Sequence, residues 1–161
     1  MKKPLTFLLA LTFLFLFSGS SVVFGDDFQD GVDAYERKDY KTAYKLFLPY
    51  AEQGDASAQY NLGQMYYEGQ GVPQNYKEAV KWYRLAAEQG NASAQSNLAG
   101  NYYQGLGVPK DYVSAHMWIN LAASNGEEDA IEKRNMVEKK MTKQQIEKAQ
   151  EMAKNWKPTS K

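Results

Sequence analysis

The apolar and small positions that begin at residue 55 recur at intervals of four. Ala58, Leu62 and Tyr66 therefore fall on one face of a helix. The pattern stops in Gly-Gln-Gly-Val-Pro at residues 69–73. Glycine permits positive φ there, and proline lacks the N–H that a continuing helix needs. The sequence thus predicts a first helix that ends in a tight turn.

A second helix is predicted directly after this turn, over roughly residues 76–89. Asn75 is expected to be its N-cap, with Glu78 three residues later completing a capping box. Gly90 lies where a glycine with positive φ commonly ends a helix. The apolar stripe of this helix consists of Ala79, Trp82 and Ala86, with Tyr83 and Ala87 beside it.

The same unit is written twice, over residues 55–90 and again over residues 91–126. Without a gap, 19 of the 36 positions are identical, and the second copy predicts another helix at roughly residues 112–125. A fixed period of this size is typical of a repeat architecture rather than of one globular core. Small residues such as Gly63 and Ala99 let the two helices of a unit approach closely.

The shared pattern is A-x-x-x-L-G-x-x-Y-x-x-G-x-G-V-x-x-x-Y-x-x-A-x-x-W-x-x-x-A-A-x-x-G, with Ala99 replacing the first glycine in the second copy. It resembles the Sel-one-like repeat, a relative of the tetratricopeptide repeat. The resemblance implies an all-α fold, an α/α solenoid of stacked helix–turn–helix units in a right-handed superhelix. We therefore expect seven or eight helices and no strands.

Residues 27–54 are predicted to form a shortened first unit. Its second helix begins 36 positions before that of the next unit, but Gly31 lies only 32 positions before Gly63. The turn between its helices is therefore expected to be four residues shorter. Pro49 predicts a kink or early fraying. The inward-facing residues of its first helix are expected to be Phe28, Ala34 and Tyr35.

Residues 127–157 depart from the repeat and are predicted to form a helical cap. A solenoid needs an atypical terminal unit to cover its last apolar surface. Thr142 can cap a final helix, with Gln145 at the capping-box position. The segment from Met141 also resembles the C-terminal cap of exported Sel-one-like proteins, and residues 158–161 are expected to be a loose tail. The apolar stripe of the final helix is Ile146, Ala149, Met152, Ala153 and Trp156.

Residues 1–25 have the features of a secretory signal peptide. Lys2 and Lys3 precede an apolar run of 13 residues, and Val23 and Gly25 are small enough for cleavage after Gly25. The alternative is a retained membrane anchor, but the run is shorter than the roughly 20 residues that span a bilayer. We expect cleavage, no membrane insertion of the mature chain, and a periplasmic or secreted location.

The chain contains no cysteine, so export brings no disulfide and stability must come from stacking. Residues 26–130 carry 8 Lys and Arg against 15 Asp and Glu, a net charge of −7, whereas residues 131–161 carry 9 against 4, a net charge of +5. This asymmetry is either ordinary solvated surface or a dipole that steers partners. No basic–aromatic motif indicates nucleic acid.

No catalytic constellation is recognisable in the sequence. His116 is the only histidine, and packing or surface exposure is its expected role. With one histidine and no cysteine, a zinc site is not expected, nor is any cofactor. The Gly-x-Gly segments at residues 69–71 and 105–107 lack the following Gly-Lys-Ser/Thr of a phosphate loop, so they are interpreted as turns.

On each predicted first helix, a stripe of polar and aromatic residues lies beside the core stripe. It faces the side that is concave in helix-pair solenoids. Tyrosine suits such a surface because it offers a large area and a polar tip. The alternative is that some of these tyrosines pack between units, whereas Tyr66 and Tyr102 are assigned to the core. The residues predicted to contact a partner are Tyr60, Gln64, Tyr67, Ser96 and Tyr103; the wider stripe adds Ser57, Glu68, Ser93, Gly100 and Gln104, with Phe28 and Tyr35 upstream.

Two classes of function remain open. The resemblance implies a non-enzymatic scaffold of the bacterial cell envelope that holds a protein or peptide partner in its concave groove. The alternative is an exported enzyme acting on β-lactam or cell-wall material, since some Sel-one-like proteins are linked to that chemistry. The second hypothesis lacks an S-x-x-K motif and a nucleophile–base pair.

Overall fold

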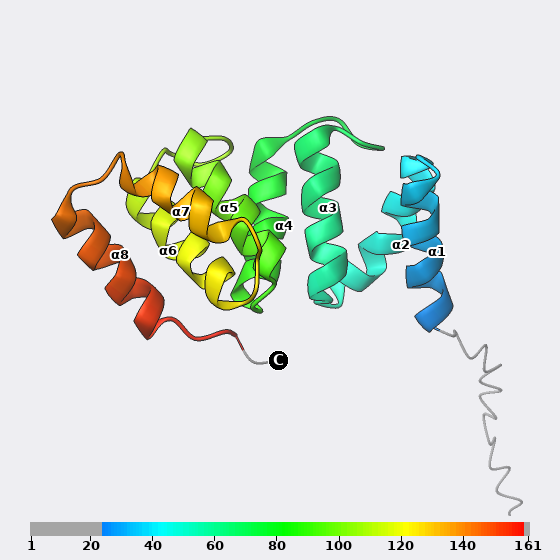
Figure 1. Ribbon diagram of the computed structural model, residues 1–161. Helices are drawn as coiled ribbons and strands as arrows, with labels where there is room; N and C mark the ends of the chain where they lie inside the picture. Colours follow the sequence, from blue (N-terminus) through cyan, green and yellow to red (C-terminus); the bar gives the residue numbers. More distant parts are fainter. Residues whose placement is uncertain (1–23, 160–161) are drawn as a thin grey trace, which may run out of the picture.

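The computed structural model describes residues 24–159, which form eight α-helices (Figure 1). No strand occurs in this part of the chain, so the predicted all-α fold is confirmed. The second helices of the two full repeats lie where the sequence placed them. The helices are α1 (Phe24–Glu36), α2 (Tyr40–Glu52), α3 (Ala56–Glu68), α4 (Tyr76–Glu88), α5 (Ala92–Gln104), α6 (Tyr112–Ser124), α7 (Ala130–Glu138) and α8 (Lys143–Asn155). The predicted signal segment lies almost entirely outside the described residues.

Each helix packs on the next one along the chain, from α1 to α6, and α6 then contacts both α7 and α8 (Figure 1). The result is an array of helix pairs, α1–α2, α3–α4 and α5–α6, with α7 and α8 at the C-terminal end. This is the solenoid that the repeat period predicts. Successive first helices thereby lie on one side of the array, and they provide the walls of the site described below.

Within a unit, the two helices approach closely because a small residue faces a large ring. A Cβ atom on Gly63 of α3 would lie 2.5 Å from the Tyr83 ring of α4, so only glycine fits beneath that ring. Tyr83 is accordingly buried in the core, as are Leu62 and Ala79. Trp82 differs from its predicted place in the central stripe, because it is half-buried and packs against the apolar cluster formed by α1, α2 and α3.

Successive units meet through the glycines of the Gly-x-Gly turns. Gly71 has φ +73°, and a Cβ there would lie 2.5 Å from the carbonyl oxygen of Tyr40 in the preceding unit. Gly107 has φ +75°, and a Cβ there would overlap the carbonyl oxygen of Tyr76. Positive φ and the close backbone approach both require glycine. The two turns are therefore contacts between units as well as connections between helices.

Buried glutamine side chains also link successive units, in addition to the glycine contacts. Gln59 donates from Nε2 to the Ala51 carbonyl oxygen at 3.0 Å, and its Oε1 accepts from Gln89 at 2.8 Å. Gln95 repeats this arrangement with Ala87 at 3.0 Å and Asn125 at 2.9 Å. Each glutamine thus bonds a carbonyl in the last turn of the preceding helix. The repeat carries this glutamine in both copies.

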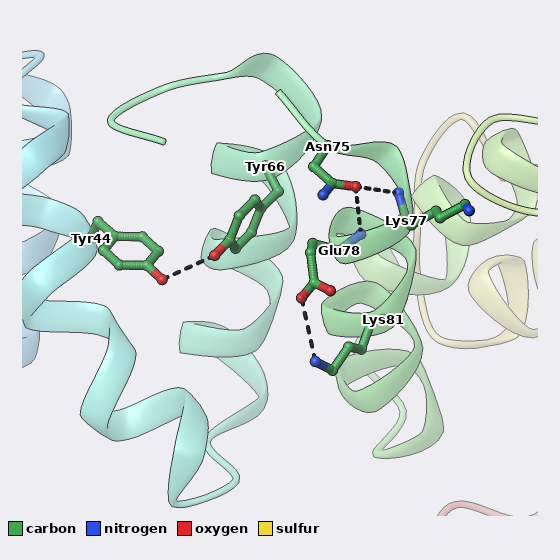
Figure 2. Close-up of polar contacts among 6 residues, drawn as sticks. All are labelled: Tyr44, Tyr66, Asn75, Lys77, Glu78 and Lys81. Atoms are coloured by element: carbon green, nitrogen blue, oxygen red, sulfur yellow. Dashed lines mark hydrogen bonds and ion pairs between the residues drawn. The ribbon is translucent and has the colours of Figure 1, made fainter. Parts of the chain in front are cut away.

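The start of α4 differs in one detail from the predicted capping box. Figure 2 shows Asn75 accepting from the backbone N–H groups of Lys77 and Glu78, as expected of an N-cap. The Glu78 carboxylate instead pairs with Lys81 at 3.3 Å. The backbone N–H of Asn75 donates to the Tyr66 carbonyl oxygen at 2.8 Å, so it has no need of Glu78.

The N-terminal unit has the predicted short turn. Residues 37–39 separate α1 from α2, whereas residues 69–75 separate α3 from α4, a difference of seven minus three, or four residues. Lys38 accommodates the tighter turn at φ +63°. The early end expected at Pro49 is not seen, because α2 continues to Glu52 and has 13 residues like α4 and α6.

The C-terminal helices cover α6 as a cap should. Thr142 and Gln145 form the predicted capping box at the start of α8. Ala149 is buried, and Trp156 packs edge-on against Trp118 of α6 with ring centroids 6.1 Å apart. Met152 was wrongly assigned to the buried stripe, since it is 37% exposed.

The segment after α8 turns back toward α4 (Figure 1). The backbone N–H of Thr159 donates to the Glu88 carbonyl oxygen at 2.8 Å, and its hydroxyl donates to the same oxygen at 3.1 Å. The loose tail expected from residue 158 is therefore wrong for Thr159. These bonds satisfy a carbonyl at the C-terminal end of α4.

The contact between units predicts a difference between two Gly→Ala substitutions. Gly90→Ala introduces a Cβ at φ +92° into open space, and should lower the free energy of unfolding by about 1–2 kcal/mol. Gly107→Ala adds the overlap with Tyr76, which should cost a further 1–3 kcal/mol, roughly. Urea unfolding of both variants measures this difference; equal losses would contradict a contact between units at Gly107.

The cap predicts a moderate role for Trp156. Trp156→Ala should cost about 2 kcal/mol, below the roughly 3–5 kcal/mol of a fully buried tryptophan, because the ring is half-buried against Trp118. Met152→Ala on the same helix is the control and should stay within about 0.5 kcal/mol of wild type. Thermal unfolding checks both; an unchanged Trp156→Ala protein would mean that α8 does not stabilise the stack.

Candidate functional site

A groove of about 550 Å³ crosses the first-helix side of the array. Its walls come from α3, α5 and α7, and its floor reaches Tyr83 of α4 and Ile119 of α6. The volume falls within the roughly 300–1,000 Å³ of ligand-binding clefts. The lining residues are Gln64, Tyr67, Glu68, Tyr83, Ser96, Asn97, Ala99, Gly100, Asn101, Tyr103, Gln104, Ile119, Lys133, Met136 and Val137.

The groove brings together four of the five residues predicted to contact a partner. Gln64, Tyr67 and Tyr103 line it and are half-buried. Ser96 also lines it but is only 5% exposed, because the Lys133 ammonium lies over it and donates to its hydroxyl at 3.0 Å. Tyr60 is not part of the lining. Its ring packs against Tyr83 with centroids 6.1 Å apart.

The groove tyrosines also pack between helices, which the sequence pattern did not assign to them. Tyr67 lies edge-on to Tyr76 at a centroid distance of 5.2 Å and touches Tyr83 at 6.5 Å. Tyr103 packs on Tyr112 at 5.5 Å. These contacts join each tyrosine to the second helix of its own unit. Each tyrosine belongs both to the helix-pair core and to the groove wall.

The neighbouring tyrosines, Tyr66 and Tyr102, make contacts between units instead. The hydroxyls of Tyr66 and Tyr44 lie 3.0 Å apart, which joins α3 to α2 (Figure 2). The Arg84 guanidinium donates to the Tyr102 hydroxyl at 2.7 Å, which joins α4 to α5. Burial, with a smaller contribution from the Tyr44 hydroxyl, raises the pKa of Tyr66 to about 12. Both side chains are half-buried and lie outside the groove lining.

The two upstream positions of the wider stripe do not join the groove. Phe28 packs between Phe47 and Tyr50 of α2, with centroids at 5.5 and 5.7 Å. The Tyr35 hydroxyl donates to Gln70 Oε1 at 2.6 Å. Phe28 therefore serves the packing of the N-terminal unit, and Tyr35 joins that unit to the turn after α3.

Gly100 forms an open stretch of groove wall. It lies inside α5, and a Cβ atom there would meet nothing within 4 Å. The equivalent residue in the preceding repeat is Gln64. Glycine inside a helix lowers stability by about 0.5–1 kcal/mol relative to alanine, and no close packing at Gly100 compensates for this loss. Its effect is to leave the α5 backbone exposed within the groove.

Asn101 places an unpartnered acceptor at the same site. Its side chain is only 1% exposed, and Nδ2 donates to the Leu106 carbonyl oxygen at 2.9 Å. That bond fixes the amide, so Oδ1 faces elsewhere and has no hydrogen-bond partner. A buried acceptor without a partner costs about 1–3 kcal/mol. The preceding repeat has Met65 here, so residues 55–90 lack this polar group.

Helix α7 supplies a wall that the sequence analysis missed. Lys133, Met136 and Val137 line the groove, and Met136 is 48% exposed. The repeat pattern is lost in this segment, so its helical phase was not assigned. One signal was available, because aligning Ala130 with Ala94 puts Lys133 at the position of Asn97.

His116 holds α7 in place. It is fully buried, and its Nε2 lies 2.8 Å from Glu138 Oε1, which Arg134 also approaches at 3.7 Å. Being closed to solvent, its imidazole cannot reach a substrate. Among residues 24–159, no three His, Asp or Glu side chains gather closely enough to hold a metal ion. In the same range, no helix combines the length and apolarity that a membrane span requires.

Comparison with protein families finds three consecutive Sel1 repeats, at residues 28–55, 56–91 and 92–127. The chain belongs to the Sel1 repeat family. The three matches coincide with the helix pairs α1–α2, α3–α4 and α5–α6 and cover more than half of the chain. Sel1 repeat proteins are generally scaffolds for protein–protein interaction, and the family is typically non-enzymatic.

Solved structures show the same fold. One is a protective antigen of uropathogenic Escherichia coli strains that displays an SLR fold, with a TM-score of 0.79 and 34% identity over 84% of this chain. Another is a Sel1 repeat protein from Oxalobacter formigenes, with a TM-score of 0.58 and 30% identity over 68% of this chain. The matches cover 30% and 60% of those two proteins. Comparison with curated proteins gave no match.

The ring contacts predict that Tyr67 and Tyr103 differ in their effect on stability. Tyr67→Ala removes two aromatic contacts and should cost about 1–3 kcal/mol, since each such pair is worth roughly 0.5–1.5 kcal/mol. Tyr103→Ala removes one contact and should cost about half as much. Urea unfolding measures both, and wild-type stability in both variants would show that these rings act only in the groove.

Proposed function

We propose that this Sel1 repeat protein is a non-enzymatic scaffold that binds an extended segment of a protein partner in the groove between α3, α5 and α7. The observation that carries the proposal is Gly100. It exposes the helix backbone at a point where packing would allow a larger residue, so a partner's chain can approach there.

The groove offers suitable chemistry for a peptide. Side-chain amides of Gln64, Asn97 and Gln104 can pair with the N–H and C=O groups of a backbone. Tyr67 and Tyr103 add aromatic area that is already ordered by their contacts with α4 and α6, so little side-chain entropy is lost on binding.

The proposed setting is the bacterial cell envelope. Support comes from the signal-like segment at residues 1–25 and from the absence of cysteine, which makes folding independent of the redox state of the compartment. The partner would then be a periplasmic or secreted protein.

Gly100→Gln tests the groove. It places the glutamine side chain of the preceding repeat into the open space, and should weaken peptide binding by roughly tenfold, equivalent to about 1.4 kcal/mol. Binding is measured with peptides selected from a phage-displayed random library on the wild-type protein.

Gly100→Ala is the matched control. One methyl group in open space should preserve most of the binding and raise stability by about 0.5–1 kcal/mol. Unchanged affinity of the Gly100→Gln protein for every selected peptide would show that peptides bind elsewhere, and the groove proposal would fail.

A further inference from the structure

Opposite walls of the groove carry opposite charges. Glu68 on α3 and Lys133 on α7 are its two charged lining residues, with α5 between them. Lys133 has a hydrogen bond to the Ser96 hydroxyl at 3.0 Å but makes no ion pair within the part of the chain that the structure describes. The Lys133 ammonium group therefore lines the groove without a paired carboxylate.

Two carboxylates on or before α7 are engaged elsewhere, and none of the others in this segment pairs with Lys133. Glu138 accepts from the buried His116 and lies near Arg134. Glu127 accepts from the Ser93 hydroxyl at 3.0 Å. The charge at Lys133 is thus left for a group from outside the chain.

The position of the Lys133 ammonium suits a bound anion. Its side chain is half-buried, and the bond to Ser96 holds Nζ against the groove wall. A charge-assisted hydrogen bond to a carboxylate is stronger than one between neutral groups, and a side chain already held in place loses less entropy on binding. Glu68 on the opposite wall disfavours a second acidic group at that end.

Apolar surface lies on the same side of the groove. Met136 is 48% exposed on the α7 wall, and Gly100 leaves space on the α5 wall. An unbranched methionine adapts to differently shaped apolar partners. A side chain placed here would bury the exposed part of Met136.

Building on the proposed function, we infer that the partner segment is an extended peptide with an acidic side chain at Lys133 and an apolar side chain over Gly100 against Met136. The complementary charge at Lys133 fixes which end of the peptide lies at α7. The capping unit is then part of the binding site as well as the end of the stack.

The experiment selects peptides from a phage-displayed random library on the wild-type chain and on Lys133→Glu and Lys133→Arg variants. Wild type and Lys133→Arg should enrich peptides with an acidic residue near an apolar one. Lys133→Glu should lose this preference and favour a basic residue instead. Lys148→Glu makes the same charge change at an exposed position on α8, and this variant should select the same kind of peptides as wild type.

Affinity measurements on a selected peptide complete the test. Lys133→Gln should weaken binding roughly fivefold, and the loss should shrink at high salt because exposed charges are screened. The same peptide with its acidic residue replaced by the neutral amide should bind wild type and Lys133→Gln equally. Thermal unfolding of each variant confirms that α7 remains folded.

The outcomes separate the two proposals. Selected peptides without an acidic residue, or the same peptides on wild type and Lys133→Glu, would overturn the role of Lys133. If Gly100→Gln still blocked those peptides, the groove itself would stand. Failure of the wild-type chain to select any peptide would overturn both.

Discussion

The stack depends on backbone approaches that only glycine permits. Gly71 lies against the Tyr40 carbonyl oxygen and Gly107 against that of Tyr76, each at positive φ. Because each helix pair packs mainly on the pairs next to it, these approaches set the spacing of the whole array. Gly63 acts in the same way inside a unit, where it accepts the Tyr83 ring. The aromatic residues fill the space between helices only because these small residues bring the backbones together.

Buried amides give the stack its specificity. Gln59 and Gln95 each join a carbonyl of the preceding unit to an amide of the following helix, so a shift in register would leave buried polar groups unpaired. The apolar contacts alone would tolerate such a shift more easily. Asn101 is an exception to this full pairing, since its Oδ1 is buried without a hydrogen-bond partner.

Helix α7 belongs both to the cap of the solenoid and to the candidate site. Helix α7 closes the stack over α6 through His116 and Glu138, and the same helix directs Lys133 and Met136 into the groove. A continuing fourth repeat would instead have presented another polar first helix. The cap thus adds a third wall to the surface that α3 and α5 form. That wall carries one charged residue, Lys133, and one exposed apolar residue, Met136.

The sequence by itself determined the repeats, their helix boundaries, the shortened first turn and the capping box at Thr142, because spacing, glycine and capping residues act locally. It also placed Gln64 and Tyr67 on one face of their helix and Tyr103 on the corresponding face of the first helix in the next repeat. Only the tertiary structure decided which side chains face solvent. Tyr60 packs on Tyr83, Ser96 lies beneath Lys133, and Trp82 joins the N-terminal cluster. These outcomes depend on neighbouring units, and helical periodicity gives the direction of a side chain without showing what it will meet.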